Sequence, residues 1–507
     1  MIKPQNVVSS LVLLIPLARA AIEWGPCGAF RQPTNLTFSC ATLEVPLDYT
    51  NKTSTEKLSL DLVKYDAVVK PAKNSILLNF GGPGGEGVGL GLVPLAPLMQ
   101  AVTGGASDLI GFNPRGTNHT IPFSCFRDAA SRSAASQLYP DVLWNASSTA
   151  PGEEWARSSL LASACKEQVS DIGELVGTQF VARDMMEIVD ALDQGPLLNY
   201  YGMSYGSVLG ETAAAMFPDR MGRVAIDGIL NPYEYYHGYG ISQYISTDDV
   251  FTGLLSSCLE AGPNQCALAQ ENITLSELET GVEAIFERLK FNPIPIPELG
   301  IILEYSTVKA QVSNMLDFPS EWPTIAAVLA GLAKNDVTPI ITLFKAATGQ
   351  APSIDFEALY GIRCGDGDLR ASSLEAYEPI AEQFEQTSKW FGDAGPTTSS
   401  RCAQWPFAAK ERYGKDFPTC VKTRNPMLIV GNTYDPATSL ESARNVTEIF
   451  EESVLLQHDG YGHLSWAQRS TCTIQYMNSY FINGTMPPRD TVCQPDHKPF
   501  SPELSAQ

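Results

Sequence analysis

The chain has 507 residues, of which 34 are lysine or arginine and 56 are aspartate or glutamate, so its formal net charge is −22. Such an acidic surface repels phosphate backbones and anionic lipid, which disfavours nucleic acid and membranes as partners. Hydrophobic residues make up 44% of the chain, which is enough for a packed core and excludes an intrinsically disordered protein. The length favours one large domain that carries a substantial insertion.

The first residues have the pattern of a secretory signal peptide. Lys3 is followed by the apolar run Val7 to Leu17 and then by Ala18-Arg19-Ala20, a small-x-small cleavage pattern. The run is shorter than the roughly 20 apolar residues that a membrane-spanning helix needs. We therefore expect cleavage after Ala20 and a secreted, extracellular protein.

Two further patterns indicate an oxidising compartment in which proteins are glycosylated. The chain has 11 cysteines, most of which should pair outside the cytosol. Near neighbours favour the bridges Cys27 with Cys40, Cys125 with Cys165, Cys258 with Cys266 and Cys472 with Cys493, while Cys364, Cys402 and Cys420 compete for one more. Sequons for N-glycosylation occur at Asn35, Asn51, Asn118, Asn145, Asn272, Asn445 and Asn483.

The N-terminal region begins with three segments typical of strands. Cys40 to Tyr49 and Leu58 to Val69 are expected at the edge of a sheet, and the apolar run Ser75 to Phe80 is expected to be buried on both faces. Gly81 to Gly85 follows at once, and consecutive glycines allow the backbone to approach a ligand closely. The spacing matches neither a P-loop nor a dinucleotide fingerprint. An oxyanion loop is favoured over a plain flexible loop because a serine motif lies downstream.

A strand and a helix precede that motif. Asp108 to Arg115 is expected to be a strand with its exit loop, in which Arg115 ties loops together beneath the site. Val181 to Leu192 has apolar residues at helical spacing. These segments extend an alternation of strands and helices, which indicates a parallel sheet.

The most informative stretch is Leu197 to Pro218. It passes from an apolar run through Gly202-Met203-Ser204-Tyr205-Gly206 into a helical segment of small residues. A short GxSxG motif alone is weak evidence, but a strand, a sharp turn and a helix around it are typical of a nucleophile elbow, with Ser204 as the candidate nucleophile. The amide of Tyr205, at the start of the helix, would stabilise the negative charge that develops on a substrate carbonyl oxygen.

The pattern changes after the next expected strand, Arg223 to Ile229. Asp227 in that strand is a minor candidate for a catalytic acid, because some hydrolases place one there. From about Tyr233 to Thr423, helical stretches such as Leu275 to Leu289 and Trp322 to Leu332 dominate. We interpret this region as a helical cap that is inserted between core strands and covers the active site.

An acid and a base follow where the core resumes. Pro426 to Val430 is an expected buried strand, and Asp435 comes just past its end, where the third member of a catalytic triad belongs. The alternative for Asp435 is an Asx turn, which is compatible with a catalytic role. Among 5 histidines, His463 follows a Gly-Tyr-Gly loop and is favoured over His458, which lies in or at the end of the short strand expected over Val454 to Leu456.

Four separated motifs together resemble a known family. They are Asn79–Gly87 (NFGGPGGEG), Gly111–Gly116 (GFNPRG), Gly202–Glu211 (GMSYGSVLGE), and the C-terminal block from Pro426–Leu440 (PMLIVGNTYDPATSL) to Gly460–Trp466 (GYGHLSW). In these motifs the chain resembles secreted tripeptidyl-aminopeptidase-like proteins of the prolyl-aminopeptidase branch of the α/β-hydrolases. Residues from about 406 to 500 look like the C-terminal, TAP-like domain of that family.

The resemblance implies a fold and a domain organisation. The fold is the α/β-hydrolase fold: a mostly parallel central sheet, helices on both faces, and a helical cap inserted after the strand that follows the nucleophile elbow. We expect a signal peptide over residues 1–20, core over 21–232 and 424–507, and the cap over 233–423. The family's triad falls on Ser204, Asp435 and His463, and its oxyanion-hole amides fall on Gly82 and Tyr205.

The resemblance also implies a serine exopeptidase that removes short pieces from the amino ends of peptides. The chain has Glu86 where serine is common and Asn113 where aspartate is usual, and the first change leaves specificity open. Glu86 is a candidate counter-charge for a substrate amino group; its alternative is a solvated loop carboxylate. Carboxylesterase action on a small metabolite and a non-catalytic binding role are the rival functions. We expect a peptide or small acyl substrate, no cofactor and no metal, and the oligomeric state is left open.

Overall fold

The computed structural model describes residues 21–28, 36–138, 141–347 and 354–505. The expected signal peptide and the sequon at Asn35 lie outside these residues. No helix in the described part of the chain is both long and apolar enough to cross a membrane.

A 10-stranded sheet runs through the molecule in the order β1-β2-β3-β5-β4-β6-β7-β10-β11-β12. The pairs from β1 to β5 are antiparallel, and every pair from β5 to β12 is parallel. The strands are β1 (Gly25–Pro26), β2 (Phe38–Pro46), β3 (Lys57–Tyr65), β4 (Ser75–Asn79), β5 (Asp108–Phe112), β6 (Leu198–Met203), β7 (Met221–Asp227), β10 (Leu428–Tyr434), β11 (Val454–Tyr461) and β12 (Val492–Cys493).

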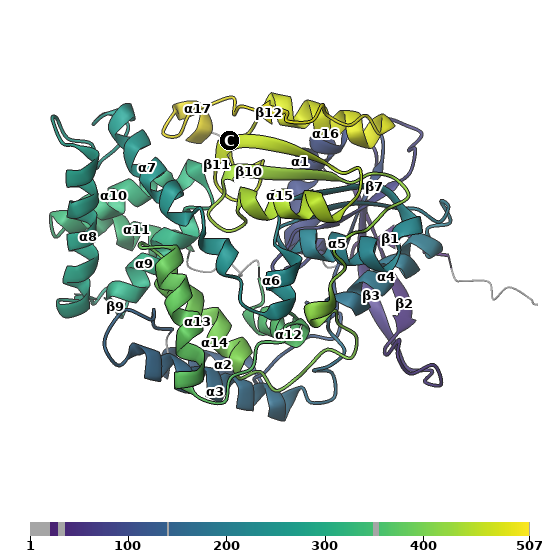
Figure 1. Cartoon of the computed structure of the whole chain (residues 1–507), viewed down its shortest axis with the longest axis horizontal. Helices are drawn as coiled ribbons and strands as arrows, with labels where there is room; N and C mark the ends of the chain where they lie inside the picture. The colour runs from purple at the N-terminus through teal and green to yellow at the C-terminus, as the bar shows by residue number, and fades with distance from the viewer. Residues whose placement is uncertain (1–20, 29–35, 139–140, 348–353, 506–507) are drawn as a thin grey trace, which may run out of the picture.

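Helices cover both faces of this sheet (Figure 1). On one face, α1 (Val93–Thr103) and α16 (Thr471–Asn483) pack on Ile76, Leu78 and Leu428. On the other face, α4 (Thr178–Ala191), α5 (Tyr205–Met216) and α15 (Leu440–Ile449) pack on residues such as Leu77 and Ile429. Successive side chains of β4 pack on opposite faces of the sheet, and the whole strand is buried, as its continuous apolar sequence predicts. This is the α/β-hydrolase fold, so the expected fold class is confirmed.

The insertion between β7 and β10 contributes to two hydrophobic cores. Helices α7 to α11 form a core of their own around Phe251, Phe286 and Leu329, and Figure 1 shows them grouped at one side of the molecule. Helices α12 to α14 instead join the core beneath the sheet through Tyr360 and Tyr377. The elements of the insertion are α6 (Pro232–His237), α7 (Thr247–Ala261), α8 (Leu275–Phe291), β8 (Ile294–Ile296), β9 (Ile301–Leu303), α9 (Tyr305–Met315), α10 (Trp322–Ala333), α11 (Thr338–Ala347), α12 (Phe356–Asp366), α13 (Leu374–Thr387) and α14 (Gly395–Ala403).

The described part of the chain has three further α-helices: α2 (Ala129–Leu138) and α3 (Ala150–Gln168) before the elbow, and α17 (Pro502–Ser505) near the end. The structure contains the four bridges that near-neighbour spacing favours. The fifth bridge joins Cys364 on α12 to Cys402 on α14, and Cys420 is an exposed free thiol.

One buried ion pair ties the N-terminal strands to α4. Both the Arg115 and the Asp184 side chains are fully buried, and Arg115 Nε and Nη2 donate to the Asp184 carboxylate at 2.6 and 2.8 Å. Arg115 also donates to the carbonyl oxygens of Pro46 and Leu47. The arginine therefore links loops beneath the site, the role expected from the sequence.

Replacing Arg115 with methionine should lower the free energy of unfolding by about 3–5 kcal/mol, because Asp184 would keep a buried charge without its partner. Urea denaturation followed by circular dichroism measures this loss. The double variant Arg115→Met/Asp184→Leu should recover most of the stability, since it removes both charges. A single variant as stable as the wild type would contradict the structural role.

Candidate active site

The candidate catalytic residues follow neighbouring parallel strands. Ser204 comes after β6, Asp435 directly after β10, and His463 shortly after β11. The glycine loop that begins at Gly81 follows β4, and β4 pairs with β6, the strand that ends before Ser204. Carboxyl ends of neighbouring parallel strands meet at one edge of a sheet, so the sheet order brings all four segments together.

The backbone at Ser204 has the conformation of a nucleophile elbow. Its φ of 57° and ψ of −122° are rare for a residue other than glycine, and the helix α5 begins at the next residue. A Cβ on Gly81 would lie 2.8 Å from the Cβ of Ser204, and one on Gly206 would lie 2.7 Å from the Asn79 carbonyl oxygen. Both positions therefore require glycine, which leaves the serine side chain next to the glycine loop.

His463 and Asp435 form the pair that a general base and its orienting acid require. Nδ1 of His463 lies 3.1 and 3.2 Å from the two carboxylate oxygens of Asp435. If Nδ1 carries the proton and donates it to the carboxylate, Nε2 is left as the acceptor, the tautomer that a base acting on a serine hydroxyl needs.

Asp435 is fully buried, and hydrogen bonds satisfy its carboxylate. It accepts from the backbone N–H groups of Ala437, Thr438 and Leu464 and from the Thr438 hydroxyl. Burial raises the pKa of the Asp435 carboxyl, but the charge of His463 and these hydrogen bonds outweigh it and hold the pKa below its usual value. The carboxylate is therefore ionised at neutral pH. The Asx turn that the Asp-Pro sequence indicates and the contact with His463 occur together.

The insertion places another carboxyl group beside the histidine. The backbone carbonyl oxygen of Asp317, between α9 and the short helix η4 (Pro319–Glu321), accepts the backbone N–H of His463 at 2.8 Å. Burial lowers the pKa of the His463 imidazole, but the negative charges of Asp435 and Asp317 more than compensate and raise it to about 9. Burial in turn raises the pKa of Asp317 to about 7.

Asp227 and His458, the alternative candidates for the acid and the base, have other hydrogen-bond partners. Asp227 is fully buried and accepts hydrogen bonds from Tyr201 and from the amide and hydroxyl of Ser465, so its carboxylate supports the loop after His463. His458 is inside β11, which is longer than the short strand that the sequence predicts. Its Nδ1 lies 3.0 Å from the Thr473 hydroxyl on α16, and burial lowers its pKa to about 4. His463 is therefore the better candidate base.

Two backbone amides are candidates for the oxyanion hole. Tyr205 is the first residue of α5, where the N–H groups of a helix are unpaired and the helix dipole favours negative charge. Gly82 follows Gly81, which contacts Ser204, and has a φ of 112°. Asn79 anchors this loop by accepting the Gly81 N–H at 3.0 Å.

Glu86 has a structural role in the glycine loop. Its Oε1 accepts the Gly89 N–H at 2.9 Å and an amide hydrogen of Asn118 at 2.7 Å. Asn118 is one of the expected glycosylation sites, and here its side chain holds the loop that approaches Ser204. The sequence could not show the contact with Asn118, because Asn118 lies far along the chain from Glu86.

Sequence reasoning missed two residues of the site. Thr438 Oγ1 lies 2.7 Å from Asp435 Oδ2 and 3.2 Å from His463 Nδ1, so this hydroxyl contacts both members of the pair. Its place three residues after an aspartate in a turn was a usable signal. Asp317 gave no such signal, since only the folded insertion brings it to the histidine.

The sheet, the elbow and the histidine–aspartate pair define a serine hydrolase with the α/β-hydrolase fold. The C-terminal part of the chain has a match of its own: residues 388–493 match the sequence model of the family described as TAP-like protein.

Curated relatives match nearly the whole chain. The tripeptidyl aminopeptidase of Streptomyces lividans is 24% identical over 496 residues, which cover 95% of this chain and 88% of that protein. The serine protease Hip1 of Mycobacterium tuberculosis is 26% identical over 505 residues, with coverages of 93% and 91%. A carboxylesterase B of Mycobacterium tuberculosis is 25% identical over 492 residues, with coverages of 95% and 91%. These matches confirm the resemblance to the tripeptidyl-aminopeptidase-like proteins.

Asp317 provides a test of the electrostatics around His463. The free base must be neutral, so kcat/KM should rise with pH through the ionisation of His463. Asp317→Asn removes a negative charge that raises this pKa, and the rising limb should therefore move to lower pH. The limb is measured from kcat/KM at a series of pH values on a substrate that the wild type hydrolyses.

Glu271→Gln is the matched control, because it removes the same charge from an exposed residue outside the site. This control should leave the limb unchanged. An Asp317→Asn limb that coincides with that of the wild type would contradict the electrostatic role of Asp317.

Proposed function

We propose that the protein is a secreted serine exopeptidase that removes short peptides from the amino ends of its substrates through an acyl-enzyme on Ser204. The observation that carries the proposal is the hydrogen-bonded His463–Asp435 pair at the sheet edge where the elbow places Ser204. The similarity to a tripeptidyl aminopeptidase and to a serine protease over nearly the full length supports peptides as the substrate class.

The reaction begins with the transfer of the Ser204 hydroxyl proton to Nε2 of His463 while the oxygen attacks the scissile carbonyl carbon. Asp435 stabilises the imidazolium that forms. The amides of Gly82 and Tyr205 donate to the oxyanion, and the loss of one such donor typically raises the barrier by about 3 kcal/mol. His463 then gives the proton to the leaving amine, and the C–N bond breaks to leave the acyl-enzyme. A water molecule, deprotonated by His463, releases the peptide acid.

An aminopeptidase also needs a negative group for the free amino end of its substrate. We assign this role to Glu86, because its loop contacts the elbow and its carboxylate is held in place by Gly89 and Asn118.

We place the core in residues 21–232 and 424–507 and the covering insertion in 233–423. Asp317 beside His463 supports this placement, since it belongs to the insertion.

We also propose that the protein is secreted and N-glycosylated. The structure contains 5 disulfide bridges, which fits an oxidising compartment. Of the proposed glycosylation sites, Asn51, Asn145, Asn272, Asn445 and Asn483 are exposed. These five positions are accessible to a modifying enzyme.

Esterase activity on a small acyl compound is the second candidate. The similarity to a carboxylesterase B over 91% of that protein favours it, and the same triad would carry it out. Only the substrate can distinguish the two activities.

The discriminating experiment compares the purified protein with its Ser204→Ala variant on three substrates: a free-amine tripeptide anilide, its N-acetylated form and a short-chain aryl ester. We expect the wild type to cleave the free-amine anilide far faster than the acetylated one. The Ser204→Ala variant should be inactive and fold normally by circular dichroism. Hydrolysis of the ester alone would move the function to an esterase, and full activity of the variant would refute the assigned nucleophile.

A Glu86→Gln variant extends the same assay. It should raise KM for the free-amine anilide and leave the kinetics on the aryl ester unchanged, because only the former carries an ammonium group. An unchanged KM on the anilide would remove Glu86 from the binding site.

A further inference from the structure

The side chain of Tyr205, whose backbone amide is assigned to the oxyanion hole, ends in a buried hydrogen-bond network that the proposed mechanism does not use. We propose that Asp366, the last residue of α12, is a positioning residue for the reaction, because it fixes Tyr205 through the Thr178 hydroxyl. The chain of contacts joins the insertion, helix α4 and helix α5.

The contacts are short and consecutive. The Tyr205 hydroxyl lies 2.6 Å from Thr178 Oγ1, and Thr178 Oγ1 donates to Asp366 Oδ2 at 2.5 Å. Because Thr178 donates its hydroxyl proton to Asp366, the Tyr205 hydroxyl is the donor in the hydrogen bond between Tyr205 and Thr178. The donors therefore run in one direction, from tyrosine through threonine to the carboxylate. All three side chains are buried, so solvent does not replace these bonds.

Asp366 is itself held at the start of α4. The Thr178 N–H, the first of that helix, lies 3.0 and 3.2 Å from the two carboxylate oxygens. A negative charge at a helix N-terminus is stabilised by the helix dipole. Burial raises the pKa of Asp366 to about 6, and the hydrogen bonds from Thr178 and Tyr235 and the charge of Arg412 oppose the rise. At neutral pH the group is therefore a carboxylate that accepts hydrogen bonds.

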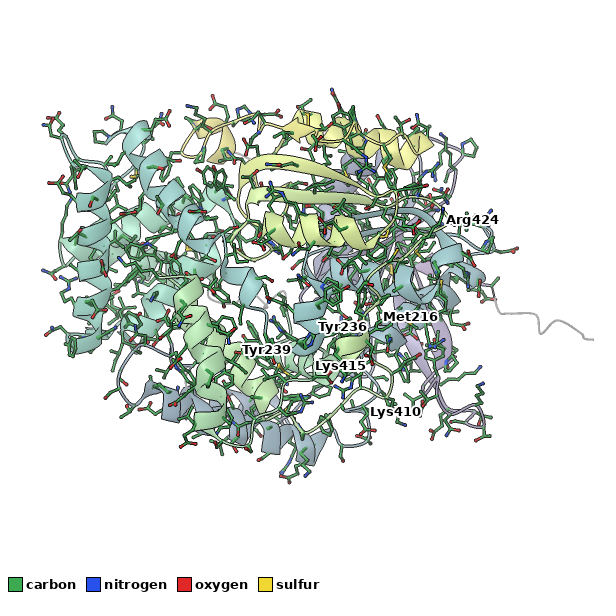
Figure 2. The ribbon with its side chains drawn as sticks, in the orientation of Figure 1. Met216, Tyr236, Tyr239, Lys410, Lys415 and Arg424 are labelled. Carbon is green, nitrogen blue, oxygen red and sulfur yellow. A yellow bond between two sulfur atoms is a disulfide. The ribbon has the colours of Figure 1, made fainter. Side chains whose placement is uncertain are left out.

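The surroundings of the network are aromatic and closely packed. Tyr235 on α6 also donates to Asp366 Oδ2, at 3.0 Å, and its ring lies 5.9 Å from the ring of Tyr205. Its neighbour Tyr236, labelled in Figure 2, lies 5.8 Å from the ring of Phe417, beside the segment that carries Lys415. The Tyr235 ring therefore packs against the ring of Tyr205, whose hydroxyl is bonded to Thr178.

The network can affect catalysis because Tyr205 carries one of the proposed oxyanion-hole amides. The ring and the backbone amide belong to one residue, directly after the strained Ser204 and at the first turn of α5. Because the hydroxyl end of the ring is anchored, a shift of the whole side chain is transmitted through Cβ and Cα to the first turn of α5 and displaces the amide relative to the serine oxygen. A displaced oxyanion donor weakens binding of the transition state and leaves binding of the ground state nearly unchanged.

The inference rests on the proposed acyl-enzyme chemistry, and its test uses whichever substrate, the tripeptide anilide or the aryl ester, the wild type hydrolyses. The variants Asp366→Asn, Thr178→Val and Tyr205→Phe should each lower kcat by about tenfold or more. KM should stay within about twofold of the wild type, because the lost interaction is made in the transition state. The double variant Asp366→Asn/Tyr205→Phe should be no slower than the slower single variant, since both break one chain.

Two matched variants separate positioning from general stability. Thr178→Ser keeps the hydroxyl and should retain most of kcat. Tyr236→Phe removes a buried hydrogen bond to Thr212, outside this chain of contacts, and should leave kcat within about twofold. Each variant's melting temperature is measured in parallel. If Asp366→Asn does not fold, the Thr178 and Tyr205 variants still decide the question.

A transition-state analogue gives an independent readout. A trifluoromethyl ketone built on the wild-type substrate forms a tetrahedral oxyanion on Ser204, so its inhibition constant should rise by the same factor by which kcat falls. Three outcomes would overturn the inference: unchanged kcat in the three variants, losses of kcat that follow melting temperature and include Tyr236→Phe, or unchanged binding of the analogue in the three variants. An active Ser204→Ala variant would instead refute the proposed function itself.

Discussion

The site depends on the backbone of Ser204. A φ of 57° at a residue other than glycine costs of order 1–3 kcal/mol, and the surrounding structure must hold it. Its N–H donates to the Asp227 carbonyl oxygen at 2.9 Å, and its carbonyl oxygen accepts the Ser207 N–H at 2.8 Å. Because β6 lies between β4 and β7, the glycine loop and the end of β7 contact the elbow from opposite sides. The sheet order thus both holds the strained serine and brings its partners to it.

Around this point the structure gathers buried carboxyl groups with separate tasks. Asp435 bonds the imidazole, Asp227 supports the loop that follows it, and Asp317 adds negative charge from the insertion. Asp366 acts on the other side of the elbow: through the Thr178 hydroxyl it fixes Tyr205, the first residue of the helix that follows Ser204. Three of these groups, Asp435, Asp317 and Asp227, raise the pKa of His463.

Much of the fold and of the candidate site could be predicted because their signals are local. The apolar run of β4, the GxSxG turn at Ser204 and the strand that ends before Asp435 depend on short stretches of sequence. The remaining features depend on contacts between distant segments. Asp317 and Asp366 reach the site only when the insertion folds onto the core, and spacing alone could not decide that Cys364 pairs with Cys402. The length of β11 was underestimated because the residues that follow Leu456, from Gln457 to Gly460, are polar or small.

The most direct test of the account is to identify the residue that becomes covalently modified. The intact protein is treated with a fluorophosphonate, which phosphonylates activated serines, then digested and analysed by tandem mass spectrometry. The account predicts a single adduct on Ser204, which forms much more slowly in the His463→Ala variant because the serine loses its base. An adduct on a different residue, or labelling of Ser204 at the same rate without His463, would contradict it.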